Sequence, residues 1–293
     1  MGVACTLCPR CCNVPRPGGY CGASAELEVA SVCLHRGEEP PISGTAGIVN
    51  IFFQHCNLRC IFCQNWQITE GDEGERHTVE SLADLIVSHR SPMVGFVTAA
   101  HYAYAVPSIV EEVRRLGFNP VIVYNSSGYE SVETLRNLEG YVDVYLPDLK
   151  YMDAGLAAAY SNAPDYPEVA SAAIMEMKRQ VGASLKLDSD GMAYRGLLVR
   201  HLVLPGAVDN ACRCLQWMAD NLSPSVGVSL MAQYFPPRPG LPAPLDLPLL
   251  QEEYDAALAC LDSLPFTKVW TQSLCAQQSY RPDFTRQNNP FES

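Results

Sequence analysis

Three cysteines within eight residues are the feature that most constrains this chain. Cys56, Cys60 and Cys63 have the spacing C-x3-C-x2-C in the segment QHCNLRCIFCQNW. An apolar run, GIVNIFF, leads directly into this segment, so the pattern predicts a strand with the cysteines on the loop that follows it. A structural zinc site normally closes with four ligands. Three thiolates on one tight loop instead suit three corners of a cubane iron–sulfur cluster, and they leave its fourth iron open to a non-protein ligand.

The sequence after residue 46 alternates apolar runs with helical patterns. We expect strands at Ile48–Phe53, Val94–Thr98, Pro120–Tyr124, Val142–Leu146, Leu197–Leu204 and Val226–Leu230, with a weaker one at Lys268–Thr271. We expect helices at Val79–His89, Val106–Leu116, Ser131–Leu138, Tyr166–Val181, Asp209–Asn221 and Leu249–Leu264. Most of the strand runs are apolar throughout, which is typical of strands buried on both faces of a parallel sheet. The pattern therefore predicts an α/β fold, either a partial (β/α)6 TIM-like barrel or a doubly wound open sheet. In both, active sites lie where the strands end.

The composition divides the chain into three predicted parts. Residues 1–45 are rich in Cys, Pro and Gly, so we expect a small loop-like module that is held together by metal. Its last part, GEEPPISG, is expected to be an extended linker, because two prolines disfavour a helix. Residues 46–275 are expected to form the α/β domain. Residues 276–293 are polar and are expected to form an irregular tail.

Composition and charge narrow the classes of function. Hydrophobic residues make up 48% of the chain and charged residues 18%, which is enough for a sizeable core. The formal net charge of −12 disfavours binding to nucleic acid. The chain shows neither a secretory signal nor an apolar stretch of about twenty residues, so we expect a cytoplasmic protein without a membrane span.

Five of the other cysteines show no metal-like spacing. The chain has 13 cysteines, and because this number is odd, complete disulfide pairing within one chain is impossible. We expect five of them to be ordinary buried or surface thiols. These are Cys33, Cys212, Cys214, Cys260 and Cys275.

The cysteine loop, with the aromatic Phe62 before its last cysteine, resembles the motif of the radical S-adenosylmethionine (SAM) superfamily. The chain is most similar to the pyruvate formate-lyase activating enzyme-like group, in a branch with an N-terminal cysteine motif. The resemblance covers nearly the whole chain through the segments LCPRCCNV, LHRGEEPPISG, CNLRCIFCQNW, YNSSGY, YLPDLKY and LLVRHLVLPG. It implies a partial (β/α)6 barrel and a [4Fe-4S] cluster on Cys56, Cys60 and Cys63 as the catalytic centre, with SAM at its open iron.

The same resemblance implies an activity and its partners. Reductive cleavage of SAM would give a 5′-deoxyadenosyl radical that abstracts a hydrogen atom, under anaerobic conditions. The electron would come from a one-electron donor such as flavodoxin or ferredoxin. The substrate would be a glycyl radical enzyme, or else another protein or a small molecule that is modified by the radical. A non-catalytic iron–sulfur protein for electron transfer or redox sensing, and a zinc-stabilised binding module, are the other classes that the cysteines allow.

The residues after the predicted strands are the candidates for contacts with SAM. Asp148 and Lys150 are two positions apart and project to the same side if the chain is extended, which suits an amino acid moiety. Arg200 and His201 alternate in direction on the fifth strand, so one of them should face inward, where an Arg would suit a carboxylate. The resemblance to the activating enzymes implies that Arg200 is this residue. The resemblance adds weaker candidates at Phe62, Asn125, Ser127, His101 and Gln233. A surface ion pair, a polar turn, a loop histidine and core packing are the alternative interpretations.

A second set of cysteines lies near the start of the chain. Cys5 and Cys8 form a chelating C-x2-C pair, and Cys12 and Cys21 complete a set of four. Cys11 is left over, because the related motif reads C-P-R-x-C. Four thiolates suit zinc, an iron–sulfur cluster or a single rubredoxin-like iron, so we expect a second metal here without choosing between them.

Overall fold

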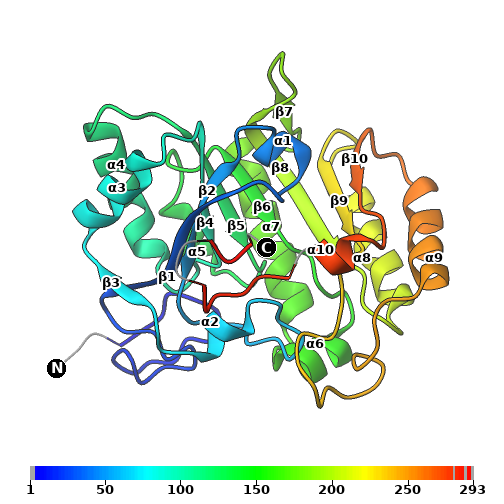
Figure 1. The fold of residues 1–293 in the computed structure, drawn as a ribbon. Coiled ribbons are helices and arrows are strands. Elements are labelled where there is room, and N and C mark those ends of the chain that lie inside the picture. Colours follow the sequence, from blue (N-terminus) through cyan, green and yellow to red (C-terminus); the bar gives the residue numbers. More distant parts are fainter. Residues whose placement is uncertain (1–3, 280, 287–288, 292–293) are drawn as a thin grey trace.

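Seven parallel strands form the centre of the computed structural model, which describes residues 4–279, 281–286 and 289–291. They are β2 (Ile48–Phe53), β4 (Met93–Val97), β5 (Val121–Ser126), β6 (Val144–Pro147), β8 (Ala193–Leu202), β9 (Gly227–Met231) and β10 (Lys268–Thr271). These strands are neighbours in the order in which they occur in the chain (Figure 1). A doubly wound sheet would reverse its strand order at a switch point. The structure is therefore a mixed α/β fold with a sequentially ordered parallel sheet at its centre.

Three further strands pair antiparallel with this sheet. β1 (Leu27–His35) pairs with β2 and with β3 (Glu75–His77), and β7 (Lys186–Leu187) pairs with β8. The expectation of loop throughout the first 45 residues is thus wrong for β1. Its sequence, LEVASVCLH, places buried side chains at Leu27, Val29, Cys33 and His35, separated by partly exposed residues. This alternation is typical of a half-buried antiparallel strand.

Helices connect the parallel strands and cover the sheet (Figure 1). The helices are α1 (Pro40–Ser43), α2 (Trp66–Glu70), α3 (Val79–Ser88), η1 (Ala103–Ala105), α4 (Val106–Arg115), α5 (Val132–Arg136), α6 (Ala154–Ser161), α7 (Tyr166–Val181), α8 (Val208–Asn221), α9 (Gln251–Asp262) and α10 (Ala276–Ser279). All six predicted helices are present, with ends that differ by at most a few residues. The extended linker is wrong for residues 40–43, because proline is well tolerated in the first helical turn, where its missing N–H has no partner to lose. The irregular tail is wrong for α10.

Alternate residues of each strand contribute to different cores. Ile51 and Phe53 of β2 belong to a large apolar core that includes side chains of α3, α4, α7, α8 and α9. Phe52, between them in sequence, packs with Cys33, Ile68 and Val97 in a separate cluster on the opposite face of the sheet. Each fully buried Leu, Ile, Val or Phe side chain contributes roughly 2 kcal/mol to folding. Both faces of the sheet are thus covered, which explains the uniformly apolar strands.

The segment after α10 passes in front of the sheet (Figure 1). Phe284 and Phe291 pack against Phe52, with ring centroids 5.3 and 5.5 Å apart. The Phe284 N–H donates to Gln67 Oε1 at 2.9 Å, and Asn289 Nδ2 donates to the Leu34 carbonyl at 3.0 Å. The tail is therefore joined to β1, β2 and α2 rather than extending away from them.

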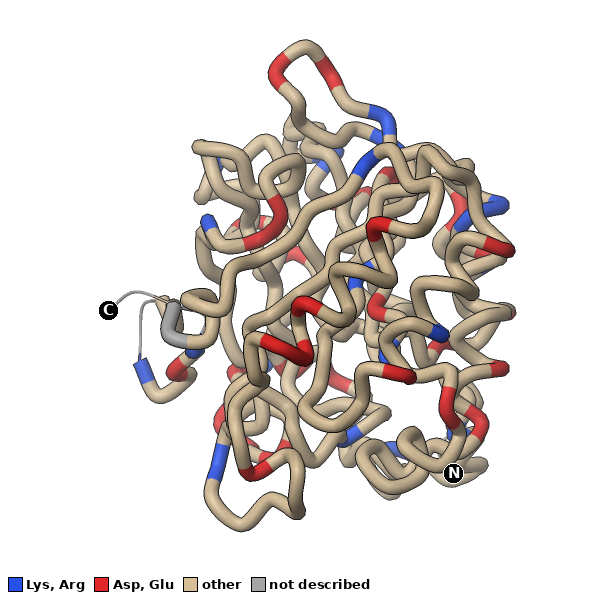
Figure 2. Tube along the Cα trace, turned by 90° about the vertical axis from the view of Figure 1, so that its right-hand side faces the viewer, with Lys and Arg blue, Asp and Glu red and all other residues tan. Residues whose placement is uncertain are grey.

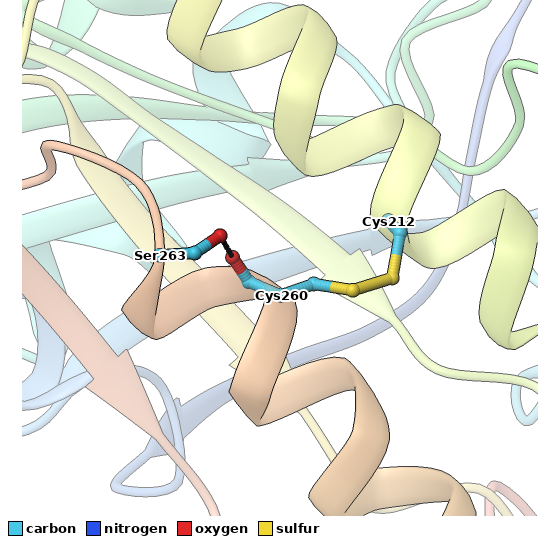
Figure 3. The surroundings of a disulfide bond; sticks show 3 residues. All are labelled: Cys212, Cys260 and Ser263. Atoms are coloured by element: carbon cyan, nitrogen blue, oxygen red, sulfur yellow. Dashed lines mark hydrogen bonds between the residues drawn. A yellow bond between two sulfur atoms is a disulfide. The ribbon is translucent and has the colours of Figure 1, made fainter.

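A disulfide joins α8 and α9 through Cys212 and Cys260 (Figure 3). The expectation of ordinary thiols is wrong for this pair. The two residues are 48 positions apart, and only the packing of both helices on the same face brings them together. Cys33, Cys214 and Cys275 take no part in a disulfide.

Acidic residues are spread over many elements of the molecule, consistent with the net charge of −12 (Figure 2). Among the described residues, none of the helices combines the length and the apolar character that crossing a bilayer requires.

Candidate functional site

A cavity of about 1160 Å³ lies inside the parallel sheet and reaches the loops that follow its strands. Ten of the predicted site residues line it. They are Cys56, Cys60, Phe62, Cys63, Asn125, Ser127, Asp148, Lys150, Arg200 and Gln233. Pro282 and Phe291 of the tail complete one side of its wall. Residues that are far apart in sequence thus share one enclosed space because each follows, or belongs to, a strand of the same sheet.

The three cysteines lie on a strained loop directly after β2. His55 and Arg59, which precede Cys56 and Cys60, have positive φ angles of 72° and 55°. Non-glycine residues adopt this conformation at a cost of about 1–3 kcal/mol, and such strain concentrates at functional sites. The side chain of His55 contacts β1, because its Nε2 lies 3.2 Å from Glu28 Oε2.

The cysteine sulfur atoms accept hydrogen bonds within the loop and from α6. The Leu58 N–H donates to Cys56 Sγ at 3.4 Å, and the Ser161 hydroxyl donates to Cys60 Sγ at 3.0 Å. Burial raises the pKa of the Cys60 thiol to about 11 and that of Cys63 to about 12. Burial also raises the pKa of Cys56. These thiols remain protonated at neutral pH unless a positively charged group binds them, which is the chemistry expected of metal ligands.

Within the described part of the chain, no three Cys, His, Asp or Glu side chains are arranged to hold a single metal ion. The cysteine loop presents its three thiols to the large cavity.

A layer of charged side chains crosses the cavity next to the cysteines. Arg200 Nε donates to Asp148 Oδ1 at 2.9 Å, and Lys150 Nζ donates to Asp148 Oδ2 at 2.5 Å. Arg200 also donates to Asn125 Oδ1 at 2.6 Å and to Glu38 Oε2 at 3.2 Å. Burial opposes ionisation of Asp148, but Arg200 and Lys150 outweigh it and hold the pKa of the carboxyl below its usual value. Burial opposes the charges of Lys150 and Arg200 as well, but the Asp148 carboxylate outweighs it and raises the pKa of both cations, so these three groups are ionised at neutral pH.

Tyr166 of α7 and the turn at Gly128 bring the ends of β5 and β6 together. The Tyr166 hydroxyl contacts the carbonyls of Ser127 and Asp148 at 2.8 Å each and accepts the Lys150 N–H at 3.0 Å. Gly128 has φ +80°, and a Cβ there would lie 2.4 Å from the Asp148 carbonyl oxygen. Sequence reasoning missed Tyr166, which lies in a predicted helix and shows no signal of this role.

Glu38 and Glu39, between β1 and α1, are the second group that sequence reasoning missed. Both line the cavity, and Glu38 accepts from Asn50 Nδ2 at 2.9 Å as well as from Arg200. Glu39 is buried, and its Oε2 has no hydrogen-bond partner. Burial raises the pKa of the Glu39 carboxyl, Arg200 opposes this, and Glu38 adds to it. The sequence signal that could have identified Glu38 and Glu39 is that two acidic residues are adjacent in the predicted linker GEEPPISG.

Gln233, after β9, belongs to a chain of amides beside Cys63. Its carbonyl accepts from Gln64 Nε2 at 2.9 Å, and its side-chain Oε1 accepts from Gln272 Nε2 at 2.8 Å. Tyr234, the next residue, is instead buried in the large core.

His101 does not line this cavity. It is buried, and its Nε2 lies 2.7 Å from the Gln54 carbonyl oxygen. Burial lowers its pKa to about 3, so the ring is neutral. It instead borders a cavity of about 10 Å³ that is also lined by the N-terminal cysteines. These are Cys5, Cys8, Cys11, Cys12 and Cys21.

Comparisons with known proteins give distant relatives. No family model matches the sequence. The chain is 28% identical over 244 residues to the uncharacterised protein MJ0674 of Methanocaldococcus jannaschii, covering 79% of this chain and 66% of that protein. It is 25% identical over 174 residues to the uncharacterised protein MJ0808 of the same organism, covering 50% of this chain and 49% of that protein. The chain thus spans from about half to just under two thirds of the length of these relatives.

Two solved structures are similar in part. A domain of a pyruvate-formate lyase-activating enzyme from Bacteroides vulgatus has 13% sequence identity and a TM-score of 0.41, covering 59% of this chain and 92% of that one. Methylornithine synthase (PylB) has 16% identity and a TM-score of 0.48, covering 73% and 61%. Similarity at this level identifies neither the family nor the activity of the chain.

Proposed function

We propose that this protein is a radical SAM enzyme whose [4Fe-4S] cluster is held by Cys56, Cys60 and Cys63. The observation that carries the proposal is the shared cavity, which joins the three-cysteine loop to the charged layer of Asp148 and Arg200. A protein that only transfers electrons would need neither a cavity of about 1160 Å³ nor a buried ionic layer beside its cluster. The sequential parallel sheet supports the partial (β/α)6 barrel that the cysteine motif implies.

The residues present fit this cofactor pair. When bound, the cluster and SAM supply reductive cleavage of the sulfonium and a 5′-deoxyadenosyl radical that abstracts a hydrogen atom. Leu58 and Ser161 donate hydrogen bonds to the sulfur atoms of Cys56 and Cys60, as expected around cluster ligands.

The charged layer supplies complementary groups for an amino acid moiety. Asp148 carries a negative charge that suits an ammonium group, and Lys150 and Arg200 suit a carboxylate. The three side chains hold one another in place before any ligand arrives, so little order has to be gained on binding. Gln233 and Ser127 offer neutral hydrogen-bonding groups on the same cavity wall.

Aromatic side chains form part of the wall. Phe62 and Phe291 line the cavity, and the tail that carries Phe291 covers one side of it. Such a wall suits a reactive radical, because solvent and free thiols would otherwise quench it. We propose that the substrate is a glycyl radical enzyme, another protein or a small molecule, and that flavodoxin or ferredoxin delivers the electron.

The test is anaerobic reconstitution with iron and sulfide, reduction with dithionite, addition of SAM, and quantification of 5′-deoxyadenosine. We expect product from the wild-type protein and none from Cys60→Ser. Cys260→Ser is the matched control, because Cys260 lies on α9 and does not line the large cavity, and it should retain activity. A reconstituted cluster whose electron paramagnetic resonance (EPR) spectrum does not change when SAM is added would contradict the proposal.

A further inference from the structure

The side chain of Arg10 joins three separate parts of the molecule. Its Nε donates to the Asn57 carbonyl at 3.0 Å, and its Nη2 donates to the Leu58 carbonyl at 3.5 Å. The same guanidinium donates to the carbonyls of Ser161 at 3.2 Å and Asn162 at 2.6 Å. One residue of the N-terminal cysteine segment thus contacts both the cysteine loop and the end of α6.

Two aromatic rings hold the guanidinium in position. Its central carbon lies 4.0 Å from the ring centroid of Tyr20 and 5.0 Å from that of Tyr129. Tyr20 belongs to the N-terminal segment, and Tyr129 follows β5. A planar cation stacked in this way keeps its donors pointed in fixed directions, which a flexible ammonium group cannot do.

Arg10 bridges the contact between the cysteine loop and the end of α6, and this contact includes a hydrogen bond to the predicted cluster ligand Cys60. Ser161, whose carbonyl accepts from Arg10, donates its hydroxyl to Cys60 Sγ at 3.0 Å. Next to it, the Ile61 N–H donates to the Tyr160 carbonyl at 2.9 Å. The position of Cys60 therefore depends on how the cysteine loop sits against the end of α6, and Arg10 binds both sides of that contact.

Arg10 also lies between N-terminal cysteines. Cys8 and Cys12 lie two positions away on either side of it, and Cys12 Sγ accepts the Tyr20 N–H at 3.2 Å. The Thr134 hydroxyl anchors the same segment through the Leu7 carbonyl. A change at the N-terminal cysteines would thus reach the cysteine loop through a short, ordered chain of contacts.

We propose that Arg10 is a positioning residue, through which the N-terminal cysteine segment fixes the geometry of the cluster-binding loop Cys56–Cys63. The consequence for chemistry rests on the proposed function, but the positioning role itself needs no bound cluster. Arg16 provides the contrast: it also belongs to the N-terminal segment and stacks on an aromatic ring, Tyr102 at 4.8 Å, but its Nε donates to the Ala23 carbonyl.

The first experiment compares Arg10→Ala, Arg10→Lys and Arg16→Ala by amide hydrogen exchange in the iron-free protein. We expect the exchange of the Ile61 amide to rise at least tenfold in Arg10→Ala and less in Arg10→Lys. It should stay near the wild-type value in Arg16→Ala, and the amides of β5 should be unchanged in all three. Unchanged exchange at Ile61 in Arg10→Ala, or an equal rise in Arg16→Ala, would overturn the proposal. If Arg10→Ala fails to fold, Arg10→Lys and Tyr20→Leu decide the question by the same measurement.

The second experiment reads the cluster by EPR after anaerobic reconstitution and reduction. Arg10→Ala should bind iron but show a broadened spectrum and at least tenfold less 5′-deoxyadenosine per cluster, with partial recovery in Arg10→Lys. A spectrum and yield equal to wild type would show that the loop does not depend on Arg10. If the wild-type protein itself binds no cluster, the proposed function fails, while the exchange data still decide the role of Arg10.

Discussion

Arg200 and Asp148 lie on neighbouring strands and form a direct ion pair, with 2.9 Å between Arg200 Nε and Asp148 Oδ1. Both side chains are largely shielded from solvent, with 13% and 15% of their surface accessible. Lys150 adds a second cation to the same carboxylate. One buried acid therefore holds two basic residues at the centre of the candidate site.

Replacing Asp148 by Asn should destabilise the protein and weaken SAM binding. The variant leaves Arg200 and Lys150 buried with less negative charge, and breaking a buried pair costs about 3–5 kcal/mol. Urea unfolding measures the loss of stability, and EPR titration measures SAM affinity. Arg213→Gln, which removes an exposed ion pair with Asp153, is the control and should cost less than about 1 kcal/mol. Equal costs for the two variants would contradict the buried-layer interpretation.

Replacing Ser161 by Ala should lower the reduction potential of the cluster. The variant removes the hydroxyl that donates to Cys60 Sγ, and hydrogen bonds to sulfur favour the reduced, more negative cluster. A redox titration followed by EPR measures the potential. Ser171→Ala on α7, whose hydroxyl bonds only the Pro167 carbonyl, should leave it unchanged.

Glu130 should make stability depend on pH. Burial raises the pKa of its carboxyl to about 7, although Ser126 and Tyr124 donate hydrogen bonds that lower it. Between its ordinary value of 4.5 and about 7, the folded chain keeps a proton that the unfolded chain releases. The free energy of unfolding therefore falls as pH rises through this window, by about 3 kcal/mol from this group.

Chemical denaturation at pH values from 4.5 to 7.5 tests this dependence. Glu130→Gln should flatten the slope in that window relative to wild type. Glu133→Gln on α5, an exposed neighbour, should not. A slope in Glu130→Gln that equals that of the wild type would assign the dependence to other groups.

Reduction of the Cys212–Cys260 disulfide should lower stability without affecting SAM cleavage. The bond closes a loop of 48 residues, for which the restriction of the unfolded chain amounts to about 4 kcal/mol at most. Urea unfolding with and without dithiothreitol measures the difference, and the double variant C212S/C260S should lose the response. Neither cysteine lines the large cavity, so 5′-deoxyadenosine formation should persist.

Gly95 should tolerate no side chain while Asn50 is present. A Cβ at Gly95 would lie 2.1 Å from Asn50 Oδ1, and Asn50 in turn donates to Glu38. Gly95→Ala should therefore cost about 1–3 kcal/mol by overpacking. The double variant with Asn50→Ala should recover part of this loss, and urea unfolding of the four-member cycle measures the coupling.

The sequence predicts most of the parallel strands well because they are buried on both faces and so read as short apolar runs. β2 and β10 match their predicted bounds, and so does α7. β1 was missed because it follows a segment dominated by Cys, Pro and Gly, which concealed its own alternation. The helix at residues 40–43 was missed because proline was interpreted as a helix breaker where it occupies the first turn.

Residues of the candidate site could be predicted where a side chain with a characteristic chemistry lies at or near the end of a predicted strand. Cys60, Asp148 and Arg200 follow or belong to predicted strands, and their residue types limit what they can do. Glu38 and Tyr166 were not predictable, because their roles depend on contacts that only the folded sheet creates. His101 follows β4 as expected, but its ring is buried against the Gln54 carbonyl and does not line the large cavity. No local sequence pattern predicts this orientation.

The tail bears on how the protein matures during synthesis. Pro282 and Phe291 leave the ribosome after every other residue that lines the cavity. While they are being made, β2 and the cysteine loop are already complete, and the side of the cavity that the tail covers is open. Iron and sulfide delivered to the nascent chain would reach the thiols before the tail covers this side, whereas in the finished protein Phe291 packs on Phe52 there.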